Sequence, residues 1–183
     1  MNLLVIVGSL RAAGFSRKLA DAVAAAAPEG AQIETTDGGT LPLYNQDLDG
    51  DDKPAPVQTL LEQVTTADGL VFVTPEFNYG IPGPVKNLID WASRPAYNSP
   101  LKGKPSLVIA HSIAPSGGAR AHAQLASVLV GTLTPVFLAP SFVVPQIHEK
   151  FDADGALTDD ITRLRLQATL PEFAAWATSQ NSA

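Results

Sequence analysis

The sequence has 183 residues, enough for one domain with a full core and too few for two comfortable ones. Apolar residues make up 45% of the chain and charged residues 16%, which excludes a disordered protein. The net charge of -6 and the scattered Lys and Arg residues argue against a nucleic-acid surface. The absence of cysteine excludes disulfides, zinc–thiolate sites and thiol redox chemistry. Any electron transfer therefore needs a bound cofactor.

The N-terminus, MNLLVIVGSL, lacks the basic segment and the small-residue cleavage site of a secretory signal. The longest apolar region, residues 136–144, is interrupted by Pro140 and Ser141 and is too short to span a bilayer. We therefore expect a cytoplasmic protein that binds neither a membrane nor a nucleic acid.

Strand-like and helix-like segments alternate along the chain, which predicts a parallel sheet wrapped by helices. Residues 3–7 are wholly apolar, as in a central strand that is covered on both faces. A helix over 16–27 and a more polar strand over 32–36 follow. After a long loop over 37–53, a second helix starts near Pro54 and Pro56.

The second half of the chain continues the alternation with a strand, a helix, a strand, a helix and a strand over residues 69–73, 84–91, 106–110, 120–130 and 136–139. Thr158 is expected to cap a last helix, with Asp159 and Asp160 at its positive end. Residues 1–178 are thus expected to form a single α/β domain with a doubly wound, five-stranded parallel sheet and helices on both faces. Residues 179–183 are expected to form a loose C-terminal tail. In such sheets, ligands bind beyond the carboxyl ends of the strands, where the strand order reverses.

The loop after the first strand, GSLRAAGFSRK over residues 8–18, has the composition of an anion cradle. It combines the hydroxyls of Ser9 and Ser16, the guanidinium of Arg11 and the N-terminus of a helix. It matches neither the GxGxxG pattern nor the P-loop pattern. A phosphate site and an ordinary strand–helix turn therefore both remain open.

The loop after the third strand, within TPEFNYGIPGPVKNLIDWAS over residues 74–93, uses ten residues before its helix begins. It supplies two flat faces, Phe77 and Tyr79, together with the polar Glu76 and Asn78. Such a mixture suits a planar heterocycle with polar edges. The alternative is that the aromatic side chains plug the rim of the core.

The loop after the fourth strand, HSIAPSGGAR over residues 111–120, is the third candidate. Ser112 offers a hydroxyl at the strand end, and Gly117 and Gly118 let the backbone approach a neighbour closely. Three such loops at one edge of a sheet predict a ligand site more strongly than any one of them.

The sequence resembles the NADPH-dependent FMN reductase family over residues 3–140. The motifs that carry the resemblance are GSLR, PLYNQDLD at 42–49, TPEFN at 74–78, IPGPVKNLIDW at 81–91 and SGG at 116–118. That family contains quinone, azo-dye and chromate reductases with a flavodoxin-like fold. The resemblance implies FMN as cofactor, NADPH or NADH as electron donor, and two-electron transfer by a ping-pong mechanism. The acceptors it implies are small molecules such as quinones, azo compounds, metal oxyanions or free flavin.

Matched residue by residue, the resemblance implies which side chains hold the flavin. Around the phosphate it implies Ser9, Leu10, Arg11, Phe15 and Ser16. Around the ring it implies Pro75, Glu76, Phe77 and Asn78, with Ser112 on the other side. Backbone amides of residues 75–79 are expected to stabilise the reduced ring. Because the flavin carries out the hydride chemistry, no catalytic residue and no metal is expected.

The resemblance also implies a homodimer or a homotetramer. Trp91 and residues 92–103 are candidate contacts between subunits. Lys86, Asn87 and Asp90 either fix the flavin loop or face a second subunit.

The chain departs from the family pattern at Gly14, Gly80 and Ala114. Two hydroxyls are missing, at positions 14 and 80, and a hydrogen bond to a charged group contributes roughly 1.5–3 kcal/mol. Two functional alternatives therefore stay open beside the reductase. One is a flavodoxin-type electron carrier, and the other is a degenerate family member that has lost tight flavin binding.

Several other residues suggest chemistry that their spacing does not support. His111, His122 and His148 lack the spacing of metal ligands. The aspartates at 47, 49, 51 and 52 lack the spacing of a calcium loop, so a solvated acidic loop is expected there. For Glu76, a structural or ring-orienting role is favoured over that of a catalytic base.

Overall fold

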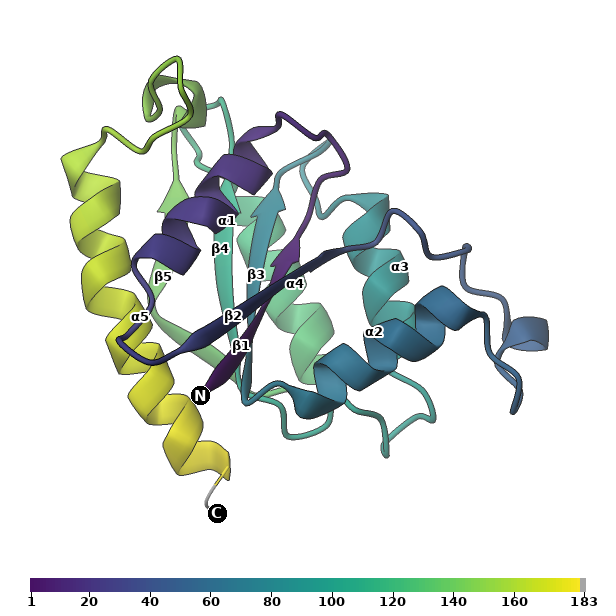
Figure 1. The fold of residues 1–183 in the computed structure, drawn as a ribbon. Coiled ribbons are helices and arrows are strands. Elements are labelled where there is room, and N and C mark those ends of the chain that lie inside the picture. Colours follow the sequence, from purple (N-terminus) through teal and green to yellow (C-terminus); the bar gives the residue numbers. More distant parts are fainter. Residues whose placement is uncertain (182–183) are drawn as a thin grey trace.

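The computed structural model describes residues 1–181, and its centre is a five-stranded parallel sheet (Figure 1). The strands are β1 (Asn2–Val7), β2 (Gln32–Asp37), β3 (Gly69–Pro75), β4 (Ser106–His111) and β5 (Val136–Val144). Their order across the sheet is β2-β1-β3-β4-β5, and every neighbouring pair is parallel. This is the strand order of flavodoxin-like folds, so the predicted fold class is confirmed.

Helices cover both faces of the sheet (Figure 1). Helices α1 (Phe15–Ala25) and α5 (Asp160–Asn181) pack on one face. On the other face lie α2 (Ala55–Thr66), α3 (Gly83–Ala92) and α4 (Ala119–Gly131). Two short 3-10 helices complete the described elements, η1 (Gln46–Leu48) and η2 (Ile147–Glu149).

The apolar runs of the central strands follow from this two-sided cover. In β1, Leu3, Val5 and Val7 belong to the core under α1 and α5. Leu4 and Ile6 point the other way, into the core under α2, α3 and α4. Because successive side chains of a strand point to opposite faces, a strand covered on both faces must be apolar throughout.

β5 is longer than predicted, since it reaches Val144 rather than residue 139. It lies at the edge of the sheet, and its register with β4 shifts between Leu107 and Ile109. An edge strand tolerates proline because one side of its backbone has no strand to bond with, and Pro140 therefore does not end it.

The last helix starts and ends differently from the prediction. Asp159, not Thr158, caps α5, because its Oδ2 accepts the Thr162 amide at 2.8 Å. The Thr158 hydroxyl instead donates to the Lys150 carbonyl. The tail expected from residue 179 is wrong for residues 179–181, which are helical and held by a hydrogen bond from Asn181 Nδ2 to the Asp68 carbonyl at 2.9 Å. Residues 182–183 lie outside the described residues.

Trp91 is buried within its own chain, so its predicted contact with a second subunit is wrong. Its indole N–H donates to the Pro42 carbonyl at 2.8 Å, and its ring packs edge-on against Tyr44. Asn87 accepts the Tyr44 amide and donates to the Pro42 carbonyl. It therefore fixes the loop that contains Pro42 and Tyr44 rather than the predicted flavin loop.

Lys86 and Asp90 were predicted either to fix the flavin loop or to face a second subunit. In the structure they form an ion pair with each other at 2.6 Å.

Among residues 1–181, no helix is both long enough and apolar enough to cross a bilayer.

Candidate functional site

The loops that follow β1, β3 and β4 meet at the carboxyl edge of the sheet, at the top of Figure 1, around a cavity of about 270 Å³. Strand β1 lies between β2 and β3. The chain therefore passes from β1 to β2 on one side of β1 and then crosses to β3 on its other side. This reversal of strand order is where open α/β sheets bind ligands. The site therefore lies where the topology predicts.

All the predicted site residues line this cavity except Leu10 and Asn78. Leu10 is 52% exposed and points toward Gly39, and Asn78 is exposed at the tip of a turn. The cavity also has lining residues that the sequence did not assign to it, namely Gly14, His111, Ile113 and Ile147. Ile147 comes from η2, which follows β5, and no sequence motif marks it.

The first loop leaves the N-terminal amides of α1 for a ligand. Gly14 is the N-cap in an extended conformation, and among residues 1–181 no side chain caps the helix. Helix N-termini with free amides attract anions. Arg11 is exposed beside this end, and within the described residues its guanidinium forms no ion pair. Gly8 is required because a Cβ there would lie 2.9 Å from Thr74 Cα in β3.

Ser16 and His111 form a buried pair beneath this helix end. The Ser16 hydroxyl lies 2.8 Å from His111 Nε2, and the two residues are 1% and 4% exposed. Burial lowers the pKa of His111 to about 4, so the imidazole is neutral at pH 7. Its Nδ1 is buried, and no atom of the described chain hydrogen-bonds to it. The only sequence signal for His111 is its place directly before Ser112 at a strand end.

The second loop folds into a tight turn. Phe77 and Gly80 exchange both backbone hydrogen bonds at 3.0 Å, and Asn78 and Tyr79 between them have φ of 48° and 67°. Two positive φ values define a type I′ turn. The amides of Glu76 and Phe77 are used inside the protein, so in the described chain only those of Asn78 and Tyr79 remain for a ligand. The expectation that amides of residues 75–79 stabilise a reduced ring therefore no longer includes those of Glu76 and Phe77.

Glu76 anchors this loop to α4 rather than facing the cavity with its carboxylate. Its Oε2 accepts the amides of Arg120 and Ala121 at 3.0 and 3.2 Å, and its side chain is 7% exposed. The Arg120 guanidinium stacks on Tyr79, 4.7 Å from the ring centroid. Gln124 Oε1 also accepts the Ile81 amide at 2.7 Å. The role of the Glu76 carboxylate is structural, because it caps α4 and positions the loop.

In the third loop, the glycines are needed by the fold itself. A Cβ on Gly117 would lie 2.9 Å from Pro145 N, and one on Gly118 would lie 3.0 Å from His111 N. The close approach predicted there is therefore to the protein's own backbone. Ser112 Oγ accepts the Ala114 amide at 3.1 Å, which leaves its proton free to donate into the cavity.

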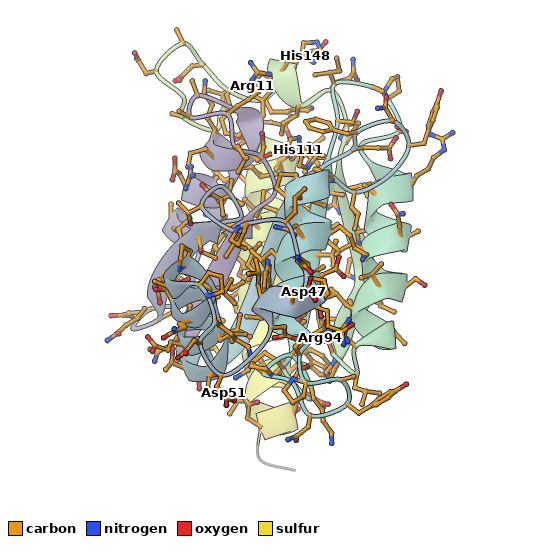
Figure 2. The ribbon with its side chains drawn as sticks, turned by 90° about the vertical axis from the view of Figure 1, so that its right-hand side faces the viewer. Arg11, Asp47, Asp51, Arg94, His111 and His148 are labelled. Carbon is orange, nitrogen blue, oxygen red and sulfur yellow. The ribbon has the colours of Figure 1, made fainter. Side chains whose placement is uncertain are left out.

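The histidines and the aspartates of residues 47–52 lack the spacing of metal ligands along the chain. Of the described His, Asp and Glu side chains, no three gather as a metal site. In the acidic loop, Asp49 is paired with Lys53 at 3.0 Å, and Asn45 caps η1 by accepting the Asp47 amide. Figure 2 shows His111 and His148 at the cavity end of the molecule, far along its length from Asp51.

The fold and the site together define a flavodoxin-like α/β protein with a phosphate-compatible cavity at its topological switch point. The sequence matches the family model for NADPH-dependent FMN reductase over residues 1–149, and the chain belongs to this family.

Relatives and solved structures agree with this assignment over nearly the whole chain. A 2-hydroxy-1,4-benzoquinone reductase from Burkholderia sp is 38% identical over 96% of both chains. A quinone reductase from Escherichia coli (strain K12) is 36% identical over 94% of this chain and 93% of its own. Among solved structures, the flavoenzyme NAD(P)H:(acceptor) oxidoreductase FerB from Paracoccus denitrificans superposes with a TM-score of 0.88 at 35% identity, covering 98% of both chains.

Proposed function

We propose that this protein is an FMN-dependent NAD(P)H oxidoreductase that passes two electrons to small acceptors, quinones foremost, by a ping-pong mechanism. The observation that carries the proposal is that the loops after β1, β3 and β4 line one shared cavity in a chain of this family. Relatives named as quinone reductases support the acceptor class. FMN, when bound, supplies the hydride acceptance and the two-electron transfer.

The cavity-lining residues of the loop after β1 fit a phosphate monoester. Ser9 and Ser16 bring hydroxyls, Arg11 a guanidinium and α1 its first-turn amides. This donor set complements a dianion, because every group can donate a hydrogen bond and Arg11 is positively charged. With Phe15 and the backbone of Leu10, whose side chain points away from the cavity, these residues form the phosphate part of the proposed site.

The cavity-lining residues of the loops after β3 and β4 fit a flat ring with polar edges. Pro75, Phe77 and Ile113 offer apolar surface, and Ser112 offers a hydroxyl proton. Asn78 and Tyr79 do not line the cavity themselves but follow Phe77 on the same loop, and their amides, which have no acceptor in the described chain, are proposed to donate to ring atoms that gain negative charge on reduction. Glu76 contributes by holding this loop against α4.

We further propose that the described residues, 1–181, act as one FMN-binding domain and that the protein is cytoplasmic and a homodimer or homotetramer. A single sheet with an apolar core on each face supports the one-domain proposal. Large exposed side chains near the cavity support a partner subunit there, since Tyr79 is 73% and Ile113 66% exposed.

The first test is the visible spectrum of the purified protein before and after loading with FMN and gel filtration. We expect retained flavin absorbance, followed by steady-state oxidation of NADPH or NADH when 1,4-benzoquinone is added. Flavin binding without that turnover would favour the electron-carrier alternative. A protein that sheds added FMN would favour the degenerate alternative.

Replacing Arg11 with glutamine is expected to weaken FMN binding by about 10- to 100-fold, because a charge-assisted hydrogen bond to the phosphate is lost. Binding of riboflavin, which lacks the phosphate, and the melting temperature should not change. Arg163→Gln is the matched control, because it removes the same charge from an exposed site on α5. Equal losses of FMN affinity in Arg11→Gln and Arg163→Gln would mean that the affinity depends on the net charge of the protein and not on a contact with Arg11.

Comparing the FMN affinity and the stability of Gly14→Ser with those of Gly14→Ala measures what the hydroxyl that is missing at position 14 would contribute. A Cβ at this N-cap lies 3.0 Å from the Arg11 carbonyl, and both variants share that crowding. We expect the serine variant to bind FMN about tenfold more tightly than the alanine variant. Its free energy of unfolding should be about 1 kcal/mol higher than that of the alanine variant, since serine caps α1. Equal FMN affinities in the two variants would show that a side chain at position 14 does not bind the phosphate.

A further inference from the structure

His111 is the last residue of β4, next to Pro75 of β3 in the register of the sheet. Leu107 and Ile109, at even spacing before it, face the core under α1, and the His111 imidazole points to the same side and reaches Ser16. Figure 2 shows His111 below Arg11, at the end of the molecule where the cavity lies. A buried imidazole therefore lies directly behind the first turn of α1.

The Ser16–His111 hydrogen bond can be made in two ways. Because burial keeps the imidazole neutral at pH 7, only one of its two nitrogens carries a proton. If the serine hydroxyl donates to Nε2, the proton sits on the buried Nδ1, for which the described chain offers no acceptor. Nδ1 is unpartnered in the described chain in either arrangement, as a donor here and as an acceptor in the other, so what separates the two is the serine oxygen, which in this one presents only lone pairs to the cavity.

In the second arrangement, Nε2–H donates to Ser16 Oγ, and the serine hydroxyl proton is free to point into the cavity. A phosphate dianion has acceptors only, so this arrangement is the one that complements it. Ser16 is 1% exposed, and its hydroxyl has no other hydrogen-bond partner among the described residues. His111 therefore determines whether the Ser16 hydroxyl donates its proton to the imidazole or into the cavity.

We propose that His111 is a positioning residue that holds the Ser16 hydroxyl as a hydrogen-bond donor to the phosphate monoester of the bound flavin. The inference rests on the proposed function, and it adds to the phosphate site a residue that acts through the Ser16 hydroxyl.

The test is a titration of the flavin-free protein with FMN and with riboflavin, followed by flavin fluorescence. His111→Phe keeps a ring of similar size without the N–H group. We expect it to weaken FMN binding about tenfold, as expected for one charge-assisted hydrogen bond, with riboflavin binding unchanged. Ser16→Ala should cause a similar loss, and the double variant should be no worse than either single variant. His111→Gln, whose amide N–H can replace Nε2–H, should recover most of the affinity.

Equal FMN affinity in His111→Phe and wild type, equal losses for FMN and riboflavin, or additive losses in the double variant would each overturn the proposal. A measurement on the unaltered protein covers the case in which a variant does not fold. Nitrogen-15 NMR of the imidazoles with bound FMN should find the His111 proton on Nε2, and a proton on Nδ1 would overturn the proposal. If wild type fails to bind FMN, the proposed function falls as well, whereas normal binding with an unaffected variant removes only the role of His111.

Discussion

Glu76→Ala is expected to lower the free energy of unfolding by about 3 kcal/mol. The change removes a carboxylate that is 7% exposed and accepts two amides at the N-terminus of α4. Those amides then lose their acceptor, and the positive end of the helix loses its compensating charge. Urea denaturation at pH 7.5 measures the loss. FMN affinity should fall too, because the loop over residues 75–81 loses its anchor on α4.

Glu172→Ala is the matched control, since this glutamate is exposed on α5 and should cost less than about 0.5 kcal/mol. Glu76→Gln keeps one carbonyl oxygen that can accept an amide, so its loss should be about half that of the alanine variant. A loss below about 1 kcal/mol in Glu76→Ala would contradict the capping role. A shifted pH profile of turnover in Glu76→Gln would instead mark Glu76 as a catalytic acid or base.

Acidification from pH 6.5 toward pH 4 is expected to remove up to about 3 kcal/mol of stability through His111. The folded-state pKa of this imidazole is lowered from 6.5 to about 4 by burial. Between these values the unfolded chain binds a proton that the folded chain does not bind. The free energy of unfolding therefore is highest above pH 6.5 and falls as the pH drops toward 4. Urea denaturation at pH 7.5, 5.5 and 4.5 follows this slope.

The matched variant is His111→Gln, which should flatten the slope because it removes the buried imidazole. His122 acts in the same direction as His111, since burial also lowers its pKa, so some slope should remain in His111→Gln. Asp159 acts at lower pH. Hydrogen bonds from Thr162 and Lys150 lower its pKa from 3.8 to about 2, and the stability it contributes is lost as the pH falls through that range. An unchanged slope in His111→Gln would contradict the assignment.

Local patterns sufficed to predict the architecture. A parallel sheet covered on both faces was indicated by the apolar runs of β1, β3 and β4 and by the helices between them. A strand that is covered on both faces must be apolar along its length. The placement of three unusual loops after these strands also predicted where the cavity lies, since carboxyl ends of parallel strands share one edge. Errors fell where tertiary contacts override local signals, as in the edge strand β5, which continues through Pro140.

Local sequence patterns were enough to predict the fold class, the edge of the sheet that carries the site, and most of the residues that line the cavity. Which polar group faces which partner follows from the folded arrangement of distant segments. Glu76 caps a helix that begins more than forty residues later, with a separation of 44 to Arg120, and Ser16 pairs with a histidine 95 residues away. Hydrogen bonds are short and directional, so their partners depend on the three-dimensional packing of distant segments. Periodicity and turn motifs report only on neighbours along the chain, and for that reason they indicated the loops but not the roles of Glu76 and His111 within them.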